Sequence, residues 1–252
     1  MSSQTAHALT DKEYWIQSYR VDEFAEYDAD NAHFRLLFRF VRPEAIRSVI
    51  EVGSYPAPFL AALGRYGWEL NGIDFHPDNS TKVPAWLESR GYKVGTFVSE
   101  DFLEFTPSRQ YDLAYSLGFI EHFTNFRDVI VKQAKLVKPG GYIFITTPNF
   151  RGFVQRWTHY FLDRQNLERH YLPSMNPSLW AEVLEREGFS VLYAGYFGQI
   201  GFWVDHLAKR SPLGRFCVKL INHLFWNIRK VYKGDSRFFS VFCGLVAVRG
   251  PA

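Results

Sequence analysis

Apolar and polar positions alternate along the chain with two different periods between residue 48 and about residue 204. Short apolar runs bounded by Gly, Pro, Asp or Asn are typical of buried strands. They cover residues 48–52, 69–73, 92–98, 111–116, 142–146, 190–196 and 239–248. Helical periodicity separates them at residues 59–66, 84–89, 125–137 and 177–187. This order predicts βα units that build an α/β fold around a mostly parallel sheet.

Three segments fall outside this alternation. Residues 10–47 have helical periodicity, so we expect residues 1–47 to form a helical cap at one edge of a domain that spans residues 48–252. Residues 150–173 mix aromatic and basic side chains in a connection long enough to predict a lid. Residues 205–235 form a second insertion, which precedes the last strand.

Composition narrows the class of protein. The 252 residues are 47% hydrophobic, which is ample for a packed core. Lys and Arg exceed Asp and Glu only by 29 to 26, so the chain has no overall nucleic-acid signature. Cys217 and Cys243 are far apart, which predicts neither a disulfide framework nor a metal-binding spacing. Without a signal-peptide pattern or a membrane-spanning run, we expect a cytoplasmic protein, with peripheral membrane contact open.

Acidic residues and a glycine follow the first three predicted strands. Glu51 and Gly53 flank the end of the first strand, where a ligand can approach backbone amides. Asp74 ends the second strand about 20 residues later, a spacing that suits the hydroxyl groups of a ribose. Asp101 and Phe102 follow the third strand and could hydrogen-bond and cover an adenine.

At this point the chain resembles the class I S-adenosyl-L-methionine-dependent methyltransferases, especially those that modify quinones, lipids, sugars and other small molecules. The resemblance covers roughly residues 48–195 and rests on the order of five motifs. They are "VIEVGS", "GIDFHPD", "SEDFLEF", "YDLAYSLGFIEHF" and "LVKPGGYIFITTPN". It implies a Rossmann-like sheet of seven strands with helices on both faces.

The resemblance also implies a set of site residues. S-adenosyl-L-methionine would contact Glu51, Gly53, Ser54, Tyr55, Asp74, Phe75, Asp101, Phe102, Ser116 and Leu117. The acceptor would contact Phe119, Glu121, Trp157, Tyr160 and Tyr171. For several of these residues a purely structural role is open: Asp101 can cap a helix, and the aromatic residues of 150–173 can simply pack on the sheet.

Two histidines are candidate general bases for a hydroxyl acceptor, His122 and His170. Each could equally be a buried histidine that only shapes the pocket. Relatives that methylate catechol-like quinone precursors carry a further acid three residues before this Glu-His pair and use a divalent metal, but Gly118 stands there in this chain. We therefore expect no metal site.

The second insertion contains a basic amphipathic helix. No acidic residue stands between Asp205 and Asp235, and the basic residues share one side of a helix whose other side is apolar. Such a helix, at residues 211–233, could lie on an anionic membrane, or it could pack on the domain or on a second subunit. Nucleic acid is a minor option, and the oligomeric state stays open.

The expected function is O-methylation of a small-molecule, sugar or lipid-linked acceptor. N-methylation of a small amine and a non-catalytic binding protein with the same fold are the alternatives. The loop "VIEVGSYPAPFL" favours the last of these, because the family pattern places glycines where Tyr55 and Ala57 stand. We expect the loop to take a different path, with Tyr55 as a wall of the methionine pocket rather than a plug.

Overall fold

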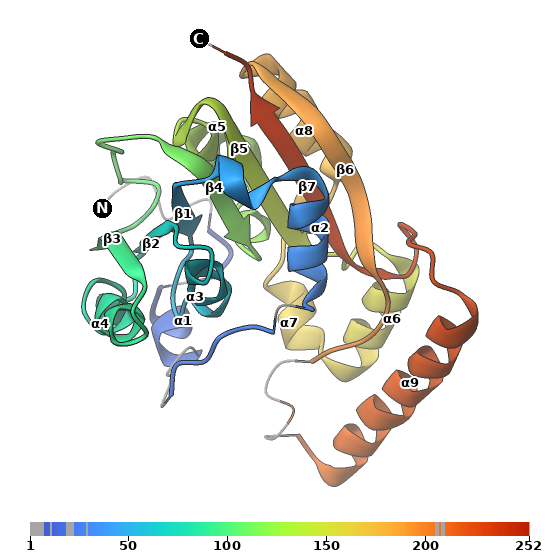
Figure 1. Ribbon diagram of the computed structural model, residues 1–252. Coiled ribbons are helices and arrows are strands. Elements are labelled where there is room, and N and C mark those ends of the chain that lie inside the picture. The colour runs from blue at the N-terminus through green and yellow to red at the C-terminus, as the bar shows by residue number, and fades with distance from the viewer. Residues whose placement is uncertain are drawn as a thin grey trace.

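The computed structural model describes residues 8–10, 12–18, 23–28, 30–204, 207 and 210–251 (Figure 1). Its centre is a seven-stranded sheet with the strand order β3-β2-β1-β4-β5-β7-β6. The strands are β1 Ser48–Val52, β2 Glu69–Asp74, β3 Lys93–Ser99, β4 Tyr111–Leu117, β5 Val137–Pro148, β6 Phe189–Ile200 and β7 Ser240–Arg249. The first five are parallel to one another, and β7 is antiparallel to both β5 and β6. The expected fold class is confirmed.

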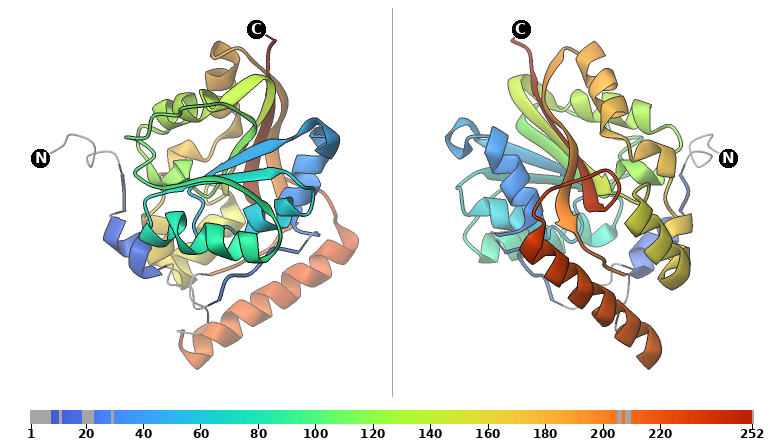
Figure 2. Two further views of the ribbon diagram at one scale, coloured as in Figure 1. Left: turned by 60° about the vertical axis from the view of Figure 1, so that its left-hand side comes forward. Right: turned by 90° about the vertical axis from the view of Figure 1, so that its right-hand side faces the viewer.

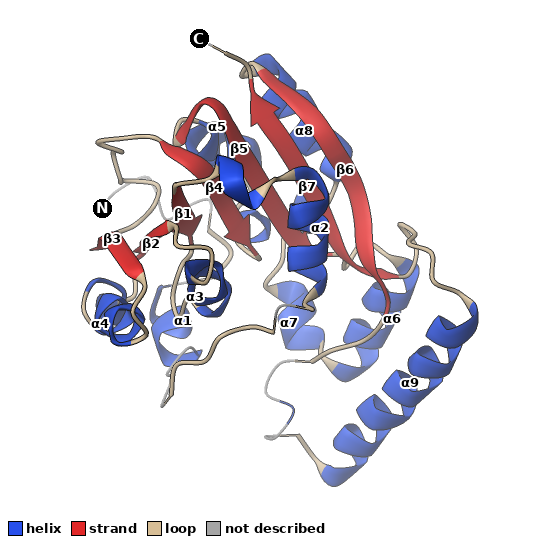
Figure 3. Ribbon diagram, in the orientation of Figure 1, coloured by secondary structure: helices blue, strands red, loops and turns tan. Residues whose placement is uncertain are grey.

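The helices occupy the predicted crossovers and the inserted segments. They are α1 Lys12–Ser18, α2 Ala32–Phe40, α3 Pro58–Gly64, α4 Lys82–Ser89, α5 Phe126–Ala134, α6 Phe153–Leu162, α7 Arg164–Glu168, α8 Pro177–Arg186 and α9 Pro212–Val231. Short 3₁₀ turns connect several of them, including Ile120–His122 after β4. Figure 3 shows these helices distributed around the sheet.

Two hydrophobic layers bury the two faces of the sheet. Because side chains alternate along a strand, Ile50 and Val52 of β1 join the layer with α5 and α8, whereas Val49 joins the layer with α2, α3 and α4. Every residue of β1 is buried, as expected for a central strand covered on both sides. The strand ends are thereby left as the open part of the sheet, where a ligand can enter.

The expected cap divides into two parts with different positions. Phe34 and Leu37 of α2 are buried in the same layer as α3, so α2 covers a face of the sheet rather than an edge. Its apolar residues recur at helical spacing and form one apolar side, which is buried against the face of the sheet. The shorter α1 lies instead at the side to which the arrowhead of β4 points (Figure 3). The pattern of apolar positions alone does not distinguish these two placements. Tyr19, which belongs to the same predicted helix, lies outside the described residues.

The two insertions form helices outside the sheet. Residues 150–173 contain α6 and α7, and α9 runs along the outside of the molecule in both views of Figure 2. Val218 and Phe225 of α9 pack in a small third cluster with Ile200 and Phe202. Among the described residues, no helix combines the length and the apolar character needed to cross a bilayer.

Candidate functional site

One cavity opens at the carboxyl ends of β1, β2 and β4. It has a volume of about 220 Å³ and is lined by residues from α1, the loop after β1, the end of β2, the turn after β3 and the segment after β4. The strand order reverses between β1 and β4, and this switch point is where open α/β sheets bind ligands. Nine of the ten predicted cofactor residues line it: Glu51, Gly53, Ser54, Tyr55, Asp74, Phe75, Asp101, Phe102 and Leu117.

The loop after β1 is held open by hydrogen bonds to β2. The backbone N–H groups of Gly53 and Ser54 both donate to the carbonyl of Ile73, at 2.9 and 3.2 Å. Gly53 has a φ of +76°, and a Cβ at this position would lie 2.8 Å from the Phe119 ring. Only glycine therefore fits between the loop and Phe119 without a shift of the ring.

Asp74 fixes both the loop and the segment that follows β2. Its carboxylate accepts hydrogen bonds from the backbone N–H of Tyr55, at 3.2 Å, and of His76, at 2.8 Å. Burial raises the pKa of Asp74 to about 6, although the two backbone donors oppose this shift. The side chain faces the cavity with acceptor lone pairs left over, since a carboxylate can accept about four hydrogen bonds.

Tyr55 is part of the cavity wall. Its ring is buried, stacks on His76 at a centroid distance of 3.6 Å and meets the edge of Phe24. Two residues later, Ala57 takes a left-handed conformation with a φ of +66°. The loop thus keeps the backbone turn that glycine usually makes, but with alanine, and Tyr55 lines the cavity without filling it.

Glu51 brings a buried acid to the floor of the cavity. Its Oε2 accepts a hydrogen bond of 2.8 Å from the hydroxyl of Tyr115. Burial raises the pKa of Glu51 well above its usual value, and the nearby Asp74 adds to the shift. A cationic group placed here would restore the ionised form of Glu51, because an opposite charge favours it.

Asp101 has the structural role that the sequence left open, and it also faces the cavity. Its Oδ1 accepts from the backbone N–H of Leu103 at 2.9 Å, and its Oδ2 pairs with Lys12 at 2.9 Å. The neighbouring Phe102 is buried and meets Phe119 edge to face at 5.8 Å. Both residues are in reach of a ligand in the cavity.

The structure does not bring every predicted site residue to the cavity. Ser116 is buried in the core, where its hydroxyl donates to Gln133 Oε1 at 3.1 Å. Trp157 and Tyr160 lie on α6 with 49% and 46% of their surfaces exposed, and they do not line the cavity. Tyr171 packs on the core and donates its backbone N–H to the carbonyl of Glu121. The predicted acceptor residue Phe119 does line the cavity.

The cavity lining also includes residues outside the predicted contact set, among them Lys12, Trp15 and His76. Lys12 and Trp15 come from α1. For Tyr14 and Trp15 of this opening helix the sequence predicts either a cover over the cofactor or packing at the edge, whereas it predicts no role for Lys12. Trp15 meets the His122 ring at 4.6 Å. His76 stacks on Tyr55. Its position two residues after Asp74 is the feature of the sequence from which a place in the cavity wall could have been predicted.

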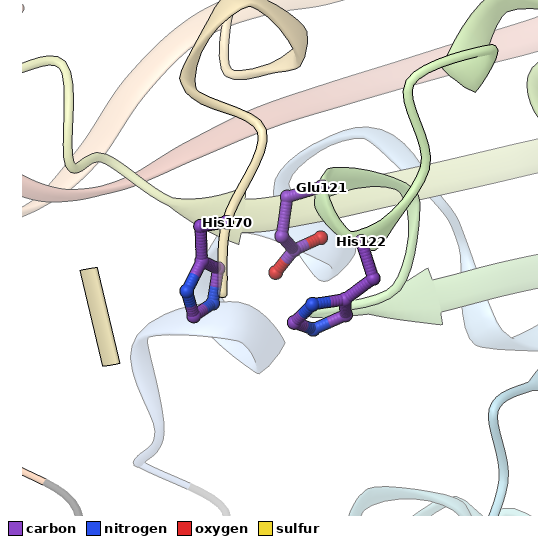
Figure 4. A group of neighbouring side chains, drawn as sticks. All are labelled: Glu121, His122 and His170. Atoms are coloured by element: carbon purple, nitrogen blue, oxygen red, sulfur yellow. The ribbon is translucent and has the colours of Figure 1, made fainter. Parts of the chain in front are cut away.

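Glu121, His122 and His170 converge beside the cavity (Figure 4). One nitrogen of each ring and a carboxylate oxygen all lie within 4.8 Å of one another. Burial lowers the pKa of His122 to about 4 and that of His170 well below its usual value, and it raises the pKa of Glu121 to about 8. The carbonyls of Arg169 and Gly118 favour the protonated His122 ring, but burial outweighs them. At pH 7 both rings are neutral, and His122 is the one of the three that lines the cavity.

Comparison with known proteins identifies relatives of two kinds. Residues 21–194 match the model of a protein family described as "Methyltransferase domain". The chain is also 33% identical over 110 residues to the ubiquinone biosynthesis O-methyltransferases of Salmonella typhimurium and Citrobacter koseri. Each match covers 42% of this chain and 44% of the relative, so the chain spans less than half the length of these curated relatives.

Solved structures share the fold over nearly the whole chain. The N-methyltransferase NodS from Bradyrhizobium japonicum WM9, in complex with S-adenosyl-L-homocysteine, has a TM-score of 0.56 at 14% identity and covers 94% of this chain and 97% of its own. Magnesium protoporphyrin IX methyltransferase from Synechocystis PCC 6803, also with S-adenosyl-L-homocysteine bound, has a TM-score of 0.55 at 12% identity and covers 94% and 93%. At these identities the similarity is one of fold.

Proposed function

Because the chain belongs to the family of methyltransferase domains and is an S-adenosyl-L-methionine-dependent methyltransferase, we propose that the cavity at the carboxyl ends of β1 to β4 holds this cofactor. The observation that carries the proposal is the convergence of Gly53, Glu51 and Asp74 at the switch point of the strand order. A nucleoside with an amino-acid tail presents hydroxyl groups and an ammonium group, which two acidic side chains can bind, and a glycine leaves room for it beside the backbone.

Each cavity residue has a distinct role in this proposal. Asp74 accepts hydrogen bonds from the ribose hydroxyls, and Asp101 with Phe102 borders the adenine. Glu51 receives the ammonium group of the methionine part, which would return this buried acid to its ionised form. Gly53 lets that part approach the backbone, and Tyr55 stacked on His76 closes the side of the pocket.

We propose a hydroxyl group as the methyl acceptor. The curated relatives are named as O-methyltransferases, which supports an oxygen acceptor on a small molecule. His122 lines the cavity as a neutral ring and donates its Nδ1–H to the carbonyl of Arg169 at 3.2 Å, so its Nε2 can take a proton. The hydroxyl would give its proton to His122 as its oxygen bonds to the methyl carbon. The carbon–sulfur bond breaks, and its electron pair leaves with the sulfur of S-adenosylhomocysteine.

N-methylation is the second enzymatic candidate. A neutral amine attacks the methyl carbon without a base, so positioning alone could supply much of the rate. This candidate needs no role for His122. A non-catalytic protein with the same fold is disfavoured by the open cavity, because Tyr55 lines it rather than fills it.

A lipid-linked acceptor would reach the enzyme at a membrane surface, and α9 suits such a surface. Five of its apolar residues form a largely exposed stripe. They are Leu213, Phe216, Leu220, Leu224 and Val231, with exposed fractions of 71%, 61%, 57%, 56% and 92%. Exposed Lys219 and Lys230 lie beside this stripe, and residues 206–234 contain no acidic residue. An apolar stripe with basic flanks is suited to anionic lipid headgroups.

Calorimetry tests the cofactor site. We expect S-adenosyl-L-methionine to bind the wild-type protein, and Asp74→Asn to weaken binding by about 10–100-fold, because hydrogen bonds to a charged group contribute roughly 1.5–3 kcal/mol. Asp78→Asn is the matched control, since Asp78 pairs with Lys82 outside the cavity. Equal affinity in all three proteins would contradict the proposed site.

Single-turnover rates test the acceptor chemistry. With catechols, phenols and lipid-linked sugars as probes, we expect His122→Ala to slow the formation of S-adenosylhomocysteine by at least about 100-fold with little change in cofactor affinity. If the protein instead transfers the methyl group to amine probes, and His122→Ala does not change that rate, N-methylation would be favoured.

A further inference from the structure

We propose that Glu121, His122 and His170 form a binding site for one divalent transition-metal ion, with Zn²⁺ as the best-suited occupant. The sequence predicted no metal, because Gly118 stands where metal-using relatives carry an acid. The fold supplies a third group from a different part of the chain. Glu121 and His122 belong to the turn after β4, and His170 follows α7.

The geometry of the cluster is close to that of a metal site. The three potential ligand atoms lie within 4.8 Å of one another. In a tetrahedral zinc site with nitrogen and oxygen ligands at about 2.0–2.2 Å, two ligand atoms lie about 3.3–3.6 Å apart. Side-chain movements of about 1–1.5 Å would therefore close the site. Figure 4 shows the three side chains pointing toward one another.

Both histidines are oriented by backbone carbonyls. His122 Nδ1 lies 3.2 Å from the carbonyl of Arg169, and His170 Nδ1 lies 2.5 Å from the carbonyl of Asn166. Because a carbonyl only accepts, Nδ1 donates in each case and the lone pair of each neutral ring is on Nε2. Metal-binding histidines are typically held in this way.

The buried carboxylate of Glu121 is the strongest single indication that a ligand binds here. Its side chain is fully buried, and neither carboxylate oxygen has a hydrogen-bond partner among the described residues. An unpartnered buried carboxylate is costly and rare. The backbone nevertheless holds it in place, since Tyr171 donates its N–H to the Glu121 carbonyl at 2.7 Å and so ties the His170 segment to it.

The donor set selects the kind of metal. Two imidazole nitrogens and one carboxylate oxygen suit Zn²⁺ and its first-row neighbours, and they do not suit Mg²⁺ or Ca²⁺, which prefer oxygen ligands alone. Zinc sites that act on substrates have three protein ligands and one open position. His122 lines the cavity, so the open position would be reached from the cofactor side.

The role of the metal rests on the proposed function. An acceptor hydroxyl in the open position would lose its proton to a solvent water molecule more readily, because a bound metal lowers the pKa of a coordinated hydroxyl. His122 Nε2 is then a metal ligand and cannot also be the base. Metal dependence of the transfer therefore separates these two roles of the same atom.

Metal titration of the full chain is the test. After chelator treatment, we expect one equivalent of Zn²⁺ to bind, and one equivalent of Co²⁺ to give visible d–d absorption. His170→Ala and Glu121→Gln should each weaken Zn²⁺ binding at least about 100-fold, beyond the effect of changing an outer ligand. His223→Ala is the matched control, because His223 is exposed on α9. Unchanged affinity in a folded His170→Ala protein, or no stoichiometric binding by the wild type, would overturn the inference.

Two further measurements keep the outcomes distinct. If His170→Ala fails to fold by circular dichroism, X-ray absorption of the zinc-loaded wild type decides, with two imidazoles and one carboxylate expected and any other set contradicting the site. Cofactor calorimetry on the metal-free protein separates the two proposals. Cofactor binding without stoichiometric metal binding would contradict the proposed metal site alone. Metal binding without cofactor binding would contradict the proposed function of the cavity alone.

Discussion

At the scale of single residues, the loop after β1 shows how a ligand pocket survives the loss of two glycines. Ala57 occupies a left-handed conformation at a φ of +66°, a region that costs energy for any residue with a Cβ. The ring of Tyr55 lies flat against His76, and the backbone of Tyr55 is not in the left-handed region. The strain of the altered loop is thus concentrated at Ala57.

Replacing this residue by glycine should release the strain. We expect Ala57→Gly to raise the free energy of unfolding by about 0.5–1 kcal/mol, because the relief in the native state exceeds the entropy that glycine adds to the unfolded chain. Urea unfolding measures the change. Ala61→Gly, in the middle of α3, is the control and should lower the free energy of unfolding by roughly 1 kcal/mol or more. A loss of stability in both variants would show that Ala57 is not strained.

A second residue-scale prediction concerns pH. Burial lowers the pKa of His33 from 6.5 to about 4 in the folded protein. Below about pH 6.5 the unfolded chain therefore binds a proton at His33 that the folded protein does not bind. The free energy of unfolding consequently falls as the pH drops toward 4. The slope from this group is at most about 1.4 kcal/mol per pH unit, and partial exposure of the ring reduces it.

The variant His33→Gln should lose less stability than the wild type on acidification. Between pH 7 and pH 5, we expect its free energy of unfolding to fall by about 1–2 kcal/mol less, because the group with the lowered pKa is gone. Urea titrations at the two pH values measure the difference. His223→Gln should follow the wild type, since His223 is exposed. Parallel curves for the wild type and His33→Gln would refute the prediction.

At the scale of elements, apolar periodicity predicted most of the fold. All seven predicted strands are present, and β1 has the predicted bounds Ser48–Val52. β5 begins at Val137, earlier than expected, because a bulge lets the stretch that reads as a Gly-rich turn pair with β4. Periodicity gives the apolar face of a helix but not its partner, which is why α2 was expected at an edge and lies on a face.

The candidate site was predictable only where it follows strand ends. Glu51, Asp74 and Asp101 each lie at or just beyond the carboxyl end of a strand of the parallel sheet, and such ends meet at one side. Trp157 and Tyr160 lie on an irregular insertion with no such rule, and they are exposed on α6. The meeting of His170 with Glu121 depends on the Tyr171 backbone bond across the fold, which no local pattern reports.

The exposed stripe of α9 carries the element-scale prediction. We expect the protein to bind vesicles that contain phosphatidylserine, and the double variant Leu220→Ser/Leu224→Ser to weaken that binding by at least about 10-fold, since each buried methylene contributes roughly 0.8 kcal/mol. Neutral vesicles and added salt should weaken it as well. Sedimentation with vesicles is the measurement. Asn227→Ser, on an exposed polar position of α9, is the control, and equal binding by all proteins or no binding by the wild type would contradict a membrane role.

At the scale of the whole molecule, the cavity is lined by segments that lie far apart in the sequence. Its lining comes from residues 8–15 at one end of the chain and from residues 51–59, 73–76, 101–102 and 117–123 within the sheet. α1 has no buried residue of its own and is connected to the sheet through pairs such as Lys12 with Asp101 and Trp15 with His122. A ligand that touches all these segments would stabilise the molecule as one unit.

A thermal shift measures this coupling. At a ligand concentration of 100 times the Kd, binding to the folded state alone adds about 2.7 kcal/mol to the free energy of unfolding. For a chain of this size that corresponds to a rise in Tm of roughly 5–10 °C. We expect this rise with S-adenosyl-L-homocysteine, together with slower proteolysis around α1. At the same ligand concentration, Asp74→Asn should show less than about half of the shift, because its weaker binding leaves a smaller linkage term, whereas Asp78→Asn should match the wild type. A full shift without protection of α1 would mean that the ligand binds to the sheet alone and that α1 does not cover it.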